Sequence, residues 1–161
     1  MKTPSFDATA MSAQATLARA ARIFVDTAPV IYFVERHPRY LPLVEPVFDR
    51  IDVGALTLVT SPVTLAECLV LPLRNAHADI AELFTDLLTH GPHTDFVAID
   101  QTIGALAAEL RAKHNLHLPD AIQASVAIVS GCDAFLTNDP KLKRVTALTV
   151  VVLDDLHQTV E

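Results

Sequence analysis

The chain has 161 residues, of which 51% are hydrophobic, and a formal net charge of −7. That length and composition predict one globular domain with a sizeable core and argue against a disordered chain. An acidic chain is a poor general binder of nucleic acid, although a bound cation and local basic residues can still hold phosphates. No apolar run reaches the roughly 18 residues that span a membrane, and the first residues do not resemble a secretory signal. We therefore expect a cytoplasmic protein without membrane contact.

Residues 1–21 are rich in Ala, Ser and Thr and show only weak periodicity. We expect an extension here, a mobile arm or a loose helix, in front of a domain at 22–161. Short apolar strands are expected at 22–26, 55–60, 96–99, 133–137 and 148–153. Helices are expected at 27–37, 40–53, 61–72, 75–90, 100–114 and 118–131, with a short one at the C-terminus. Apolar strands that alternate with helices predict an α/β protein of three layers, α/β/α, with a central parallel sheet of about five strands.

Two of these helices have a one-sided apolar pattern. In the helix at 75–90, the apolar face consists of Ile80, Leu83, Phe84, Leu87 and Leu88. In the helix at 118–131, the periodic positions are Ile122, Ser125, Val126 and Val129. Cys68 and Cys132 lie in apolar segments without the spacing of a metal site, so we expect both to be buried free thiols.

The segment 118–139 is predicted to bring two carboxylates together. A helix at 118–131 advances roughly 20 Å at 1.5 Å per residue. The strand at 133–137 returns about 17 Å at 3.3 Å per residue. Because the two paths nearly cancel, we expect Asp120 and Asp139 to lie close together.

Asp26 falls at the carboxyl end of the first strand, where open α/β sheets bind their ligands. Each of the three aspartates also has a simpler explanation. Asp26 and Asp139 can be N-caps of the helices that follow them, and Asp120 can complement the positive end of its own helix. None of the three alone therefore indicates a functional site.

Glu67 lies in the segment PVTLAECLVLPL, which is apolar on nearly every helical face and is therefore predicted to be buried. An ionised carboxylate there costs several kcal/mol unless it is paired or bound to a cation. No Lys or Arg stands within a helical turn to neutralise it. Either Glu67 is protonated, or it coordinates a cation directly or through water, and coordination is the better account.

Four acidic side chains, hereafter the acidic cluster, are thus expected to meet: Asp26, Glu67, Asp120 and Asp139. A set of oxygen ligands favours Mg²⁺ or Mn²⁺ over zinc. Such an ion polarises a phosphodiester and lowers the pKa of a bound water, so hydrolysis needs no histidine base. A histidine metal site is the weaker alternative, since a predicted helix end and loop separate His114 from His117.

Four segments resemble, in the same order, the acidic motifs of PIN-domain ribonucleases: FVDTAPVIY, SPVTLAECL, LPDAIQASVA and FLTNDPKL. The likeness covers roughly residues 22–155 and is closest to VapC-type toxins of bacterial toxin–antitoxin pairs. It implies a PIN-like fold and a Mg²⁺-dependent endoribonuclease, usually a homodimer, which acts on RNA and is inhibited by a cognate antitoxin protein.

The resemblance also implies roles for individual residues. All four members of the acidic cluster would be catalytic, with Asp26 and Asp120 as direct metal ligands. Asp139 would complete the site directly or through water, and Glu67 would hold a water or a second ion. Thr137 matches a hydroxyl residue that supports the last carboxylate.

Other interpretations remain open. A phosphatase with an aspartyl nucleophile needs a second Asp two residues after the first, where Ala28 stands. A catalytically inactive PIN-like binding module is disfavoured because all four carboxylates are present. A housekeeping RNA-processing nuclease fits the same residues, and an antitoxin gene directly upstream would decide for the toxin. The extension at 1–21 departs from such toxins, which usually begin a few residues before the first strand.

Overall fold

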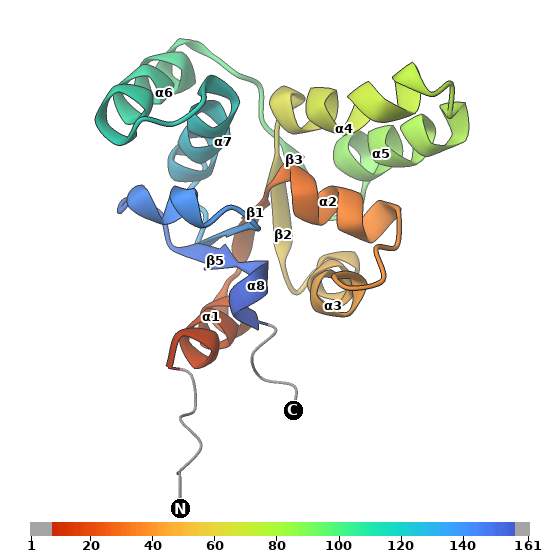
Figure 1. Ribbon diagram of the computed structural model, residues 1–161, viewed down its shortest axis with the longest axis horizontal. Helices are drawn as coiled ribbons and strands as arrows, with labels where there is room; N and C mark the ends of the chain where they lie inside the picture. Colours follow the sequence, from red (N-terminus) through yellow and green to blue (C-terminus); the bar gives the residue numbers. More distant parts are fainter. Residues whose placement is uncertain (1–7, 157–161) are drawn as a thin grey trace, which may run out of the picture.

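Residues 8–156, which the computed structural model describes, form a parallel β-sheet with helices on both of its faces (Figure 1). The five strands have the order β3-β2-β1-β4-β5, and each neighbouring pair is parallel. They are β1 (Arg22–Val25), β2 (Thr57–Thr60), β3 (Thr94–Phe96), β4 (Ala134–Thr137) and β5 (Val150–Val152). The predicted three-layer α/β/α architecture is confirmed.

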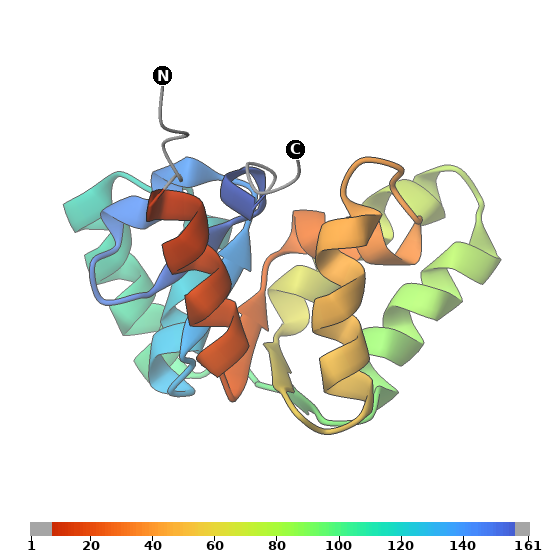
Figure 2. The same ribbon diagram turned by 90° about the horizontal axis from the view of Figure 1, so that it is seen from below.

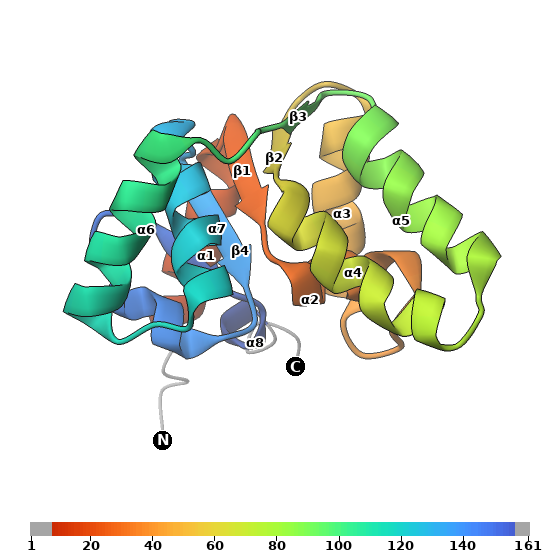
Figure 3. The same ribbon diagram turned by 90° about the horizontal axis from the view of Figure 1, so that it is seen from above.

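Each face of the sheet has its own apolar core, because successive strand residues point to opposite faces. Val25 and Leu136 belong to the core beneath α1, α2, α3, α5 and α8, whereas Phe24 and Phe135 belong to the core beneath α6, α7 and η1. Figure 3 shows α7 in front of β4 and α1 behind it, and Figure 2 shows α1 from its own side. The helices are α1 (Ala8–Arg19), α2 (Thr27–Val34), α3 (Leu41–Asp52), α4 (Pro62–Arg74), α5 (Ala78–His90), α6 (Gln101–His114), α7 (Leu118–Val129), the 3₁₀ helix η1 (Pro140–Arg144) and α8 (Leu153–Leu156).

The direction of chain winding reverses between β1 and β4. β2 and β3 are added on one side of β1, whereas β4 and β5 are added on the other. Val25 pairs with Leu136 in this register, and the N–H of Asp26 donates to the carbonyl of Leu136 at 2.9 Å. The carboxyl ends of β1 and β4 are therefore level, at the point where open α/β sheets bind ligands.

The N-terminal extension is helical over the residues that can be described. Helix α1 packs against α8 and β5, and Figure 1 shows it beside α8. The guanidinium of Arg50 donates to the carbonyls of Leu17 and Ala20, at 2.6 and 3.0 Å, and so satisfies groups at the end of α1. Of the two expected conformations, the described part adopts the helix, and residues 1–7 of the extension lie outside the described residues.

Several local expectations were wrong. The third strand is Thr94–Phe96 rather than 96–99, because it pairs residue by residue with the last three residues of β2, Leu58 to Thr60. Leu83 is 54% exposed and Val129 is 47% exposed, so the buried faces of α5 and α7 are narrower than the periodicity indicated. Ser61 occupies the N-cap position of α4, but its hydroxyl makes no capping hydrogen bond.

The two cysteines and the question of a membrane span can also be compared with the structure. Cys68 and Cys132 are both free thiols, as predicted, and Cys68 is buried whereas Cys132 is only partly so. Burial raises the pKa of each thiol to about 12, which makes them poor nucleophiles. Within residues 8–156, no helix combines the length and the apolar character needed to cross a membrane.

Leu88 and Leu83 form a matched pair on α5. Leu88 has no exposed surface and packs in one core with Phe84, whereas Leu83 is mostly exposed. We expect Leu88→Ala to lower the free energy of unfolding by about 2–5 kcal/mol, because it leaves a cavity. Leu83→Ala should change it by less than about 0.5 kcal/mol. Urea denaturation followed by circular dichroism measures both, and equal losses would contradict the packing of α5 described here.

Candidate functional site

Asp26 directly follows β1 and is buried, with 7% of its surface exposed. Its Oδ1 accepts from the backbone N–H of Thr27 at 2.8 Å, and its Oδ2 accepts from the hydroxyl of Thr137 at 2.7 Å. Asp26 is thus the N-cap of α2, the simpler role considered for it. Each carboxylate oxygen accepts one hydrogen bond here and has capacity for another partner. The capping role therefore does not exclude a ligand.

Thr137 links Asp26 to Asp139. While its hydroxyl donates to Asp26, the same oxygen accepts from the backbone N–H of Asp139 at 3.0 Å. Asp139 is half-buried, and its Oδ1 caps η1 by accepting from the N–H of Lys141 at 3.0 Å. The supporting hydroxyl implied by the resemblance thus contacts the backbone of the last carboxylate residue and the side chain of the first.

Glu67 is exposed, and the prediction that it is buried was wrong. The described residues bury only Thr64, Cys68 and Pro72 on α4, while Val70 and Leu71 are 49% and 55% exposed. The neighbours of α4 cover one side of it, although its sequence is apolar on most sides. An exposed carboxylate needs no cation to offset burial, so only its position relates Glu67 to the other three carboxylates.

That position is set by a buried amide. Gln123 of α7 is fully buried, and its Nε2 lies within hydrogen-bond distance of Thr27 Oγ1 at 3.1 Å, Thr64 Oγ1 at 3.0 Å and Glu67 Oε1 at 3.3 Å. Its two N–H groups are therefore shared among three oxygens. The hydroxyl of Thr27 also donates to Glu67 Oε1 at 2.9 Å. Glu67 is therefore held towards α2 and α7, the helices that begin at Asp26 and near Asp120.

Gln123 was missed in the sequence analysis. The one available signal is a polar residue three positions after Asp120, on a helix that is otherwise mostly apolar. Spacing of three places both side chains on one helical face. Its hydrogen-bond partners, however, belong to α2 and α4, which are far away in the sequence.

Asp120 lies in the first turn of α7 and is half-buried. Burial raises the pKa of its carboxyl, and the charges of Asp139 and Glu67 raise it further, while His117 and Lys141 act in the opposite direction. Burial likewise raises the pKa of Asp26 from 3.8 to about 6, against the hydrogen bonds of its two donors. The charges of Asp120 and Glu67 add to that rise. All four members of the acidic cluster are thus electrostatically coupled.

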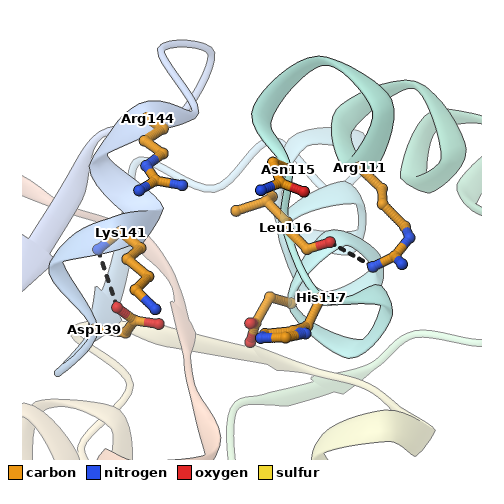
Figure 4. A pocket seen from close by; sticks show the side chains of 8 residues that line it. Arg111, Asn115, Leu116, His117, Asp139, Lys141 and Arg144 are labelled. Atoms are coloured by element: carbon orange, nitrogen blue, oxygen red, sulfur yellow. Dashed lines mark hydrogen bonds between the residues drawn. The ribbon is translucent and has the colours of Figure 1, made fainter.

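A pocket of about 320 Å³, hereafter the basic pocket, adjoins the cluster (Figure 4). Asp120 and Asp139 share it, as expected from the lengths of the helix and strand that separate them. Its lining consists of Arg111, Asn115, Leu116, His117, Asp120, Asp139, Lys141 and Arg144. Figure 4 shows Arg144 and Lys141 reaching into it from η1, opposite Asn115 and His117.

The chemistry of the cluster fits a hard divalent cation. Its donors are carboxylate oxygens, and among the ion pairs of the described residues none involves Asp26, Glu67 or Asp120. Over residues 8–156, however, no three acidic, His or Cys side chains are already arranged to hold one ion. Chelation of one ion by three carboxylates therefore requires side chains to rotate from the positions described here. The same finding gives no support to a site at His114 and His117.

The PIN domain family model matches residues 23–148. VapBC2 from Rickettsia felis, bound to a DNA fragment from its promoter, is 17% identical with a TM-score of 0.62, over 80% of this chain and 96% of that one. DNA-bound VapBC from Salmonella typhimurium is 16% identical with a TM-score of 0.60, over 83% and 98%. VapC20 from Mycobacterium tuberculosis, a toxin that cleaves the sarcin–ricin loop, is 16% identical with a TM-score of 0.59, over 70% and 86%. No curated protein matches the chain. At these identities the solved structures show a shared fold.

The raised pKa of Asp26 predicts a pH-dependent stability. A carboxyl whose pKa is higher in the folded than in the unfolded state stabilises the fold below the unfolded value, near 3.9, and loses this contribution as the pH rises through about 6. Asn cannot ionise and still caps α2. In EDTA, the difference in free energy of unfolding between Asp26→Asn and the wild type should therefore shift in favour of the variant by about 2–3 kcal/mol between pH 4 and pH 8. Urea denaturation at both pH values measures the gain.

Asp133 provides a control of opposite sign. Its exposed carboxylate accepts from the N–H groups of Arg22 and Ala21, and these hydrogen bonds lower its pKa. A lowered pKa stabilises the fold above the unfolded value and is lost on acidification. Asp133→Asn should therefore lose stability relative to the wild type as the pH rises. A gain for both variants would contradict the site-specific origin of the effect at Asp26.

Proposed function

The chain belongs to the PIN-domain family, and we propose that it is a Mg²⁺-dependent endoribonuclease that hydrolyses RNA phosphodiester bonds. One observation carries the proposal: four coupled carboxylates lie at the topological switch point of the sheet. Carboxylates so placed repel one another, and a divalent cation relieves that repulsion. Mn²⁺ is the natural substitute, since it accepts the same oxygen ligands.

In this proposal each carboxylate has a distinct role. Asp26 and Asp120 are direct metal ligands: Asp26 is fixed by two donors, and Asp120 faces the basic pocket. Asp139 completes the site with its free Oδ2, directly or through water. Glu67 would hold a water or a second ion. Thr137 supports Asp26 and the backbone of Asp139.

A bound Mg²⁺ would polarise the scissile phosphodiester and lower the pKa of a coordinated water. The contribution of the protein itself is to fix Asp26 and Glu67 beforehand. The N–H of Thr27 and the hydroxyl of Thr137 fix one rotamer of Asp26. Gln123 and Thr27 together hold Glu67 in place. Such preorganisation reduces the reorganisation needed when substrate and ion bind.

The structurally similar proteins include toxin–antitoxin complexes. This similarity supports the more specific proposal that the ribonuclease is a toxin with a cognate antitoxin partner. The acidic cluster also favours such a partner, because an Arg side chain binds carboxylates bidentately and can block them without metal. A homodimer and a cytoplasmic location belong to the same proposal. So does the division into an extension at 1–21 and a domain at 22–161, which is supported by a family match that begins at residue 23.

The metal mechanism is tested with Asp120→Asn. This variant should reduce cleavage of a single-stranded RNA by about 100-fold or more, because it removes a ligand charge from a half-buried surface position. EDTA should do the same to the wild type. Mg²⁺ should raise the melting temperature of the wild type but not of Asp120→Asn. Asp79→Asn, in the exposed first turn of α5, removes the same charge elsewhere and should cleave normally. Cleavage that survives both Asp120→Asn and EDTA would exclude a metal-dependent mechanism.

The toxin assignment is tested in cells. Expressed alone in the native host, the wild type should arrest growth, whereas Asp26→Ala should be harmless because the metal site is lost. Co-expression of the gene directly upstream should restore growth, and its product should co-purify with the enzyme. If the wild type is tolerated at high level although it cleaves RNA in vitro, the housekeeping nuclease replaces the toxin.

A further inference from the structure

The basic pocket extends the acidic cluster in one direction. It lies between η1, which follows β4, and the connection 115–117 between α6 and α7. Figure 4 shows Asp139 and His117 at one end and Arg144 and Asn115 at the other. Its volume of about 320 Å³ is near the lower limit of ligand pockets, about 300–1,000 Å³. The pocket therefore suits one small group next to the carboxylates rather than a folded partner.

The charge of this pocket differs from that of the whole chain. Three permanent cations line it, Arg111, Lys141 and Arg144, against the two carboxylates of Asp120 and Asp139. The chain as a whole has a formal net charge of −7. Charges gathered in a concave site act on a ligand more strongly than the same charges on a flat surface. The pocket is thus a local positive site in an acidic protein.

The three cations differ in what they already contact. Arg111 donates from Nη1 to the carbonyl of Leu116 at 2.6 Å, and so stabilises the connection 115–117. The charge of Lys141 acts on Asp120, and Figure 4 shows its side chain directed towards Asp139. Arg144 is exposed, and its guanidinium has no hydrogen bond or ion pair with any other residue in the described range 8–156. Its guanidinium is therefore available to an anionic ligand.

The lining also indicates the kind of group that fits. Apart from the imidazole of His117, no lining side chain is aromatic, so the stacking surface that holds a nucleobase is small. Leu116 is the one apolar side chain of the lining. A guanidinium opposite the amide of Asn115 instead matches the oxygens of a phosphate, which accept hydrogen bonds from both.

We propose that the basic pocket binds a backbone phosphate of the RNA next to the scissile phosphodiester, with Arg144 as its principal ligand and Asn115 opposite. The proposal rests on the ribonuclease function proposed above and adds the position of the substrate strand. The neighbouring phosphate lies at the Arg144 end, away from Asp139, so its charge does not oppose the acidic cluster. Because the contact is to phosphate, it positions RNA of any sequence.

The test measures binding, so that it does not depend on cleavage. A fluorescein-labelled single-stranded RNA is titrated with full-length Asp26→Asn protein, which keeps the basic pocket, at one fixed Mg²⁺ concentration and several KCl concentrations. Adding Arg144→Gln should raise the Kd about five- to tenfold. It should also reduce the slope of log Kd against log[KCl] by about 0.7, the value for one phosphate contact on a single strand. Arg144→Lys should retain the slope.

Arg74→Gln in the last turn of α4 is the matched control, since it removes one exposed Arg charge outside the pocket. It should leave both Kd and slope unchanged. Equal effects of Arg74→Gln and Arg144→Gln would overturn the proposal in favour of a general charge effect, as would RNA binding that is indifferent to Arg144→Gln. If RNA does not bind but a poly-glutamate peptide does, and loses affinity with Arg144→Gln, the pocket is an acidic-protein site and the proposal fails. If RNA binds through Arg144 but the protein never cleaves RNA, the proposed ribonuclease function fails, whereas the proposed phosphate binding by the basic pocket stands.

Discussion

The hydroxyl of Thr137 joins the two halves of the site. It donates to the carboxylate of Asp26, which follows β1, and accepts from the backbone N–H of Asp139, which follows β4. This contact exists because β1 and β4 are parallel neighbours in a register that pairs Val25 with Leu136. A side chain without the hydroxyl would leave a buried carboxylate oxygen and an N–H without a partner, at a cost of about 1–3 kcal/mol for each.

Opposing interactions determine whether Asp26, in the acidic cluster, is ionised. Burial and the charges of Asp120 and Glu67 favour the neutral form of Asp26, whereas its two hydrogen-bond donors favour the ionised form. The resulting pKa of about 6 means that Asp26 is mostly ionised at neutral pH but only by a small margin. A nearby cation adds to the donors and removes the conflict. At neutral pH the metal-free fold thus retains an electrostatic cost, which either protonation or a positively charged ligand relieves.

The places of Asp26, Asp120 and Asp139 in the fold could be predicted from the sequence. Each follows a strand or lies at the start of a helix, and such ends are set by neighbouring residues in the chain. The burial of Glu67 could not be inferred in this way. An apolar helix is buried only where neighbours cover it, and α4 leaves Val70 and Leu71 exposed. Gln123 was equally inaccessible, since its three acceptors belong to α2 and α4 and meet it only after the chain has folded. Local patterns therefore predicted the strand ends and not the side-chain network between helices.

Net charge was similarly a poor guide to the surface next to the cluster. The formal charge of −7 argues against general attraction to RNA, yet three cations share one pocket with Asp120 and Asp139. The two ends of this region have opposite preferences, because the carboxylates favour a cation and Arg144 favours an anion. A basic protein segment that covers the carboxylates would occupy the positions proposed for the metal ion and for the scissile phosphate. Inhibition by such a partner and binding of RNA are then mutually exclusive for an electrostatic as well as a steric reason.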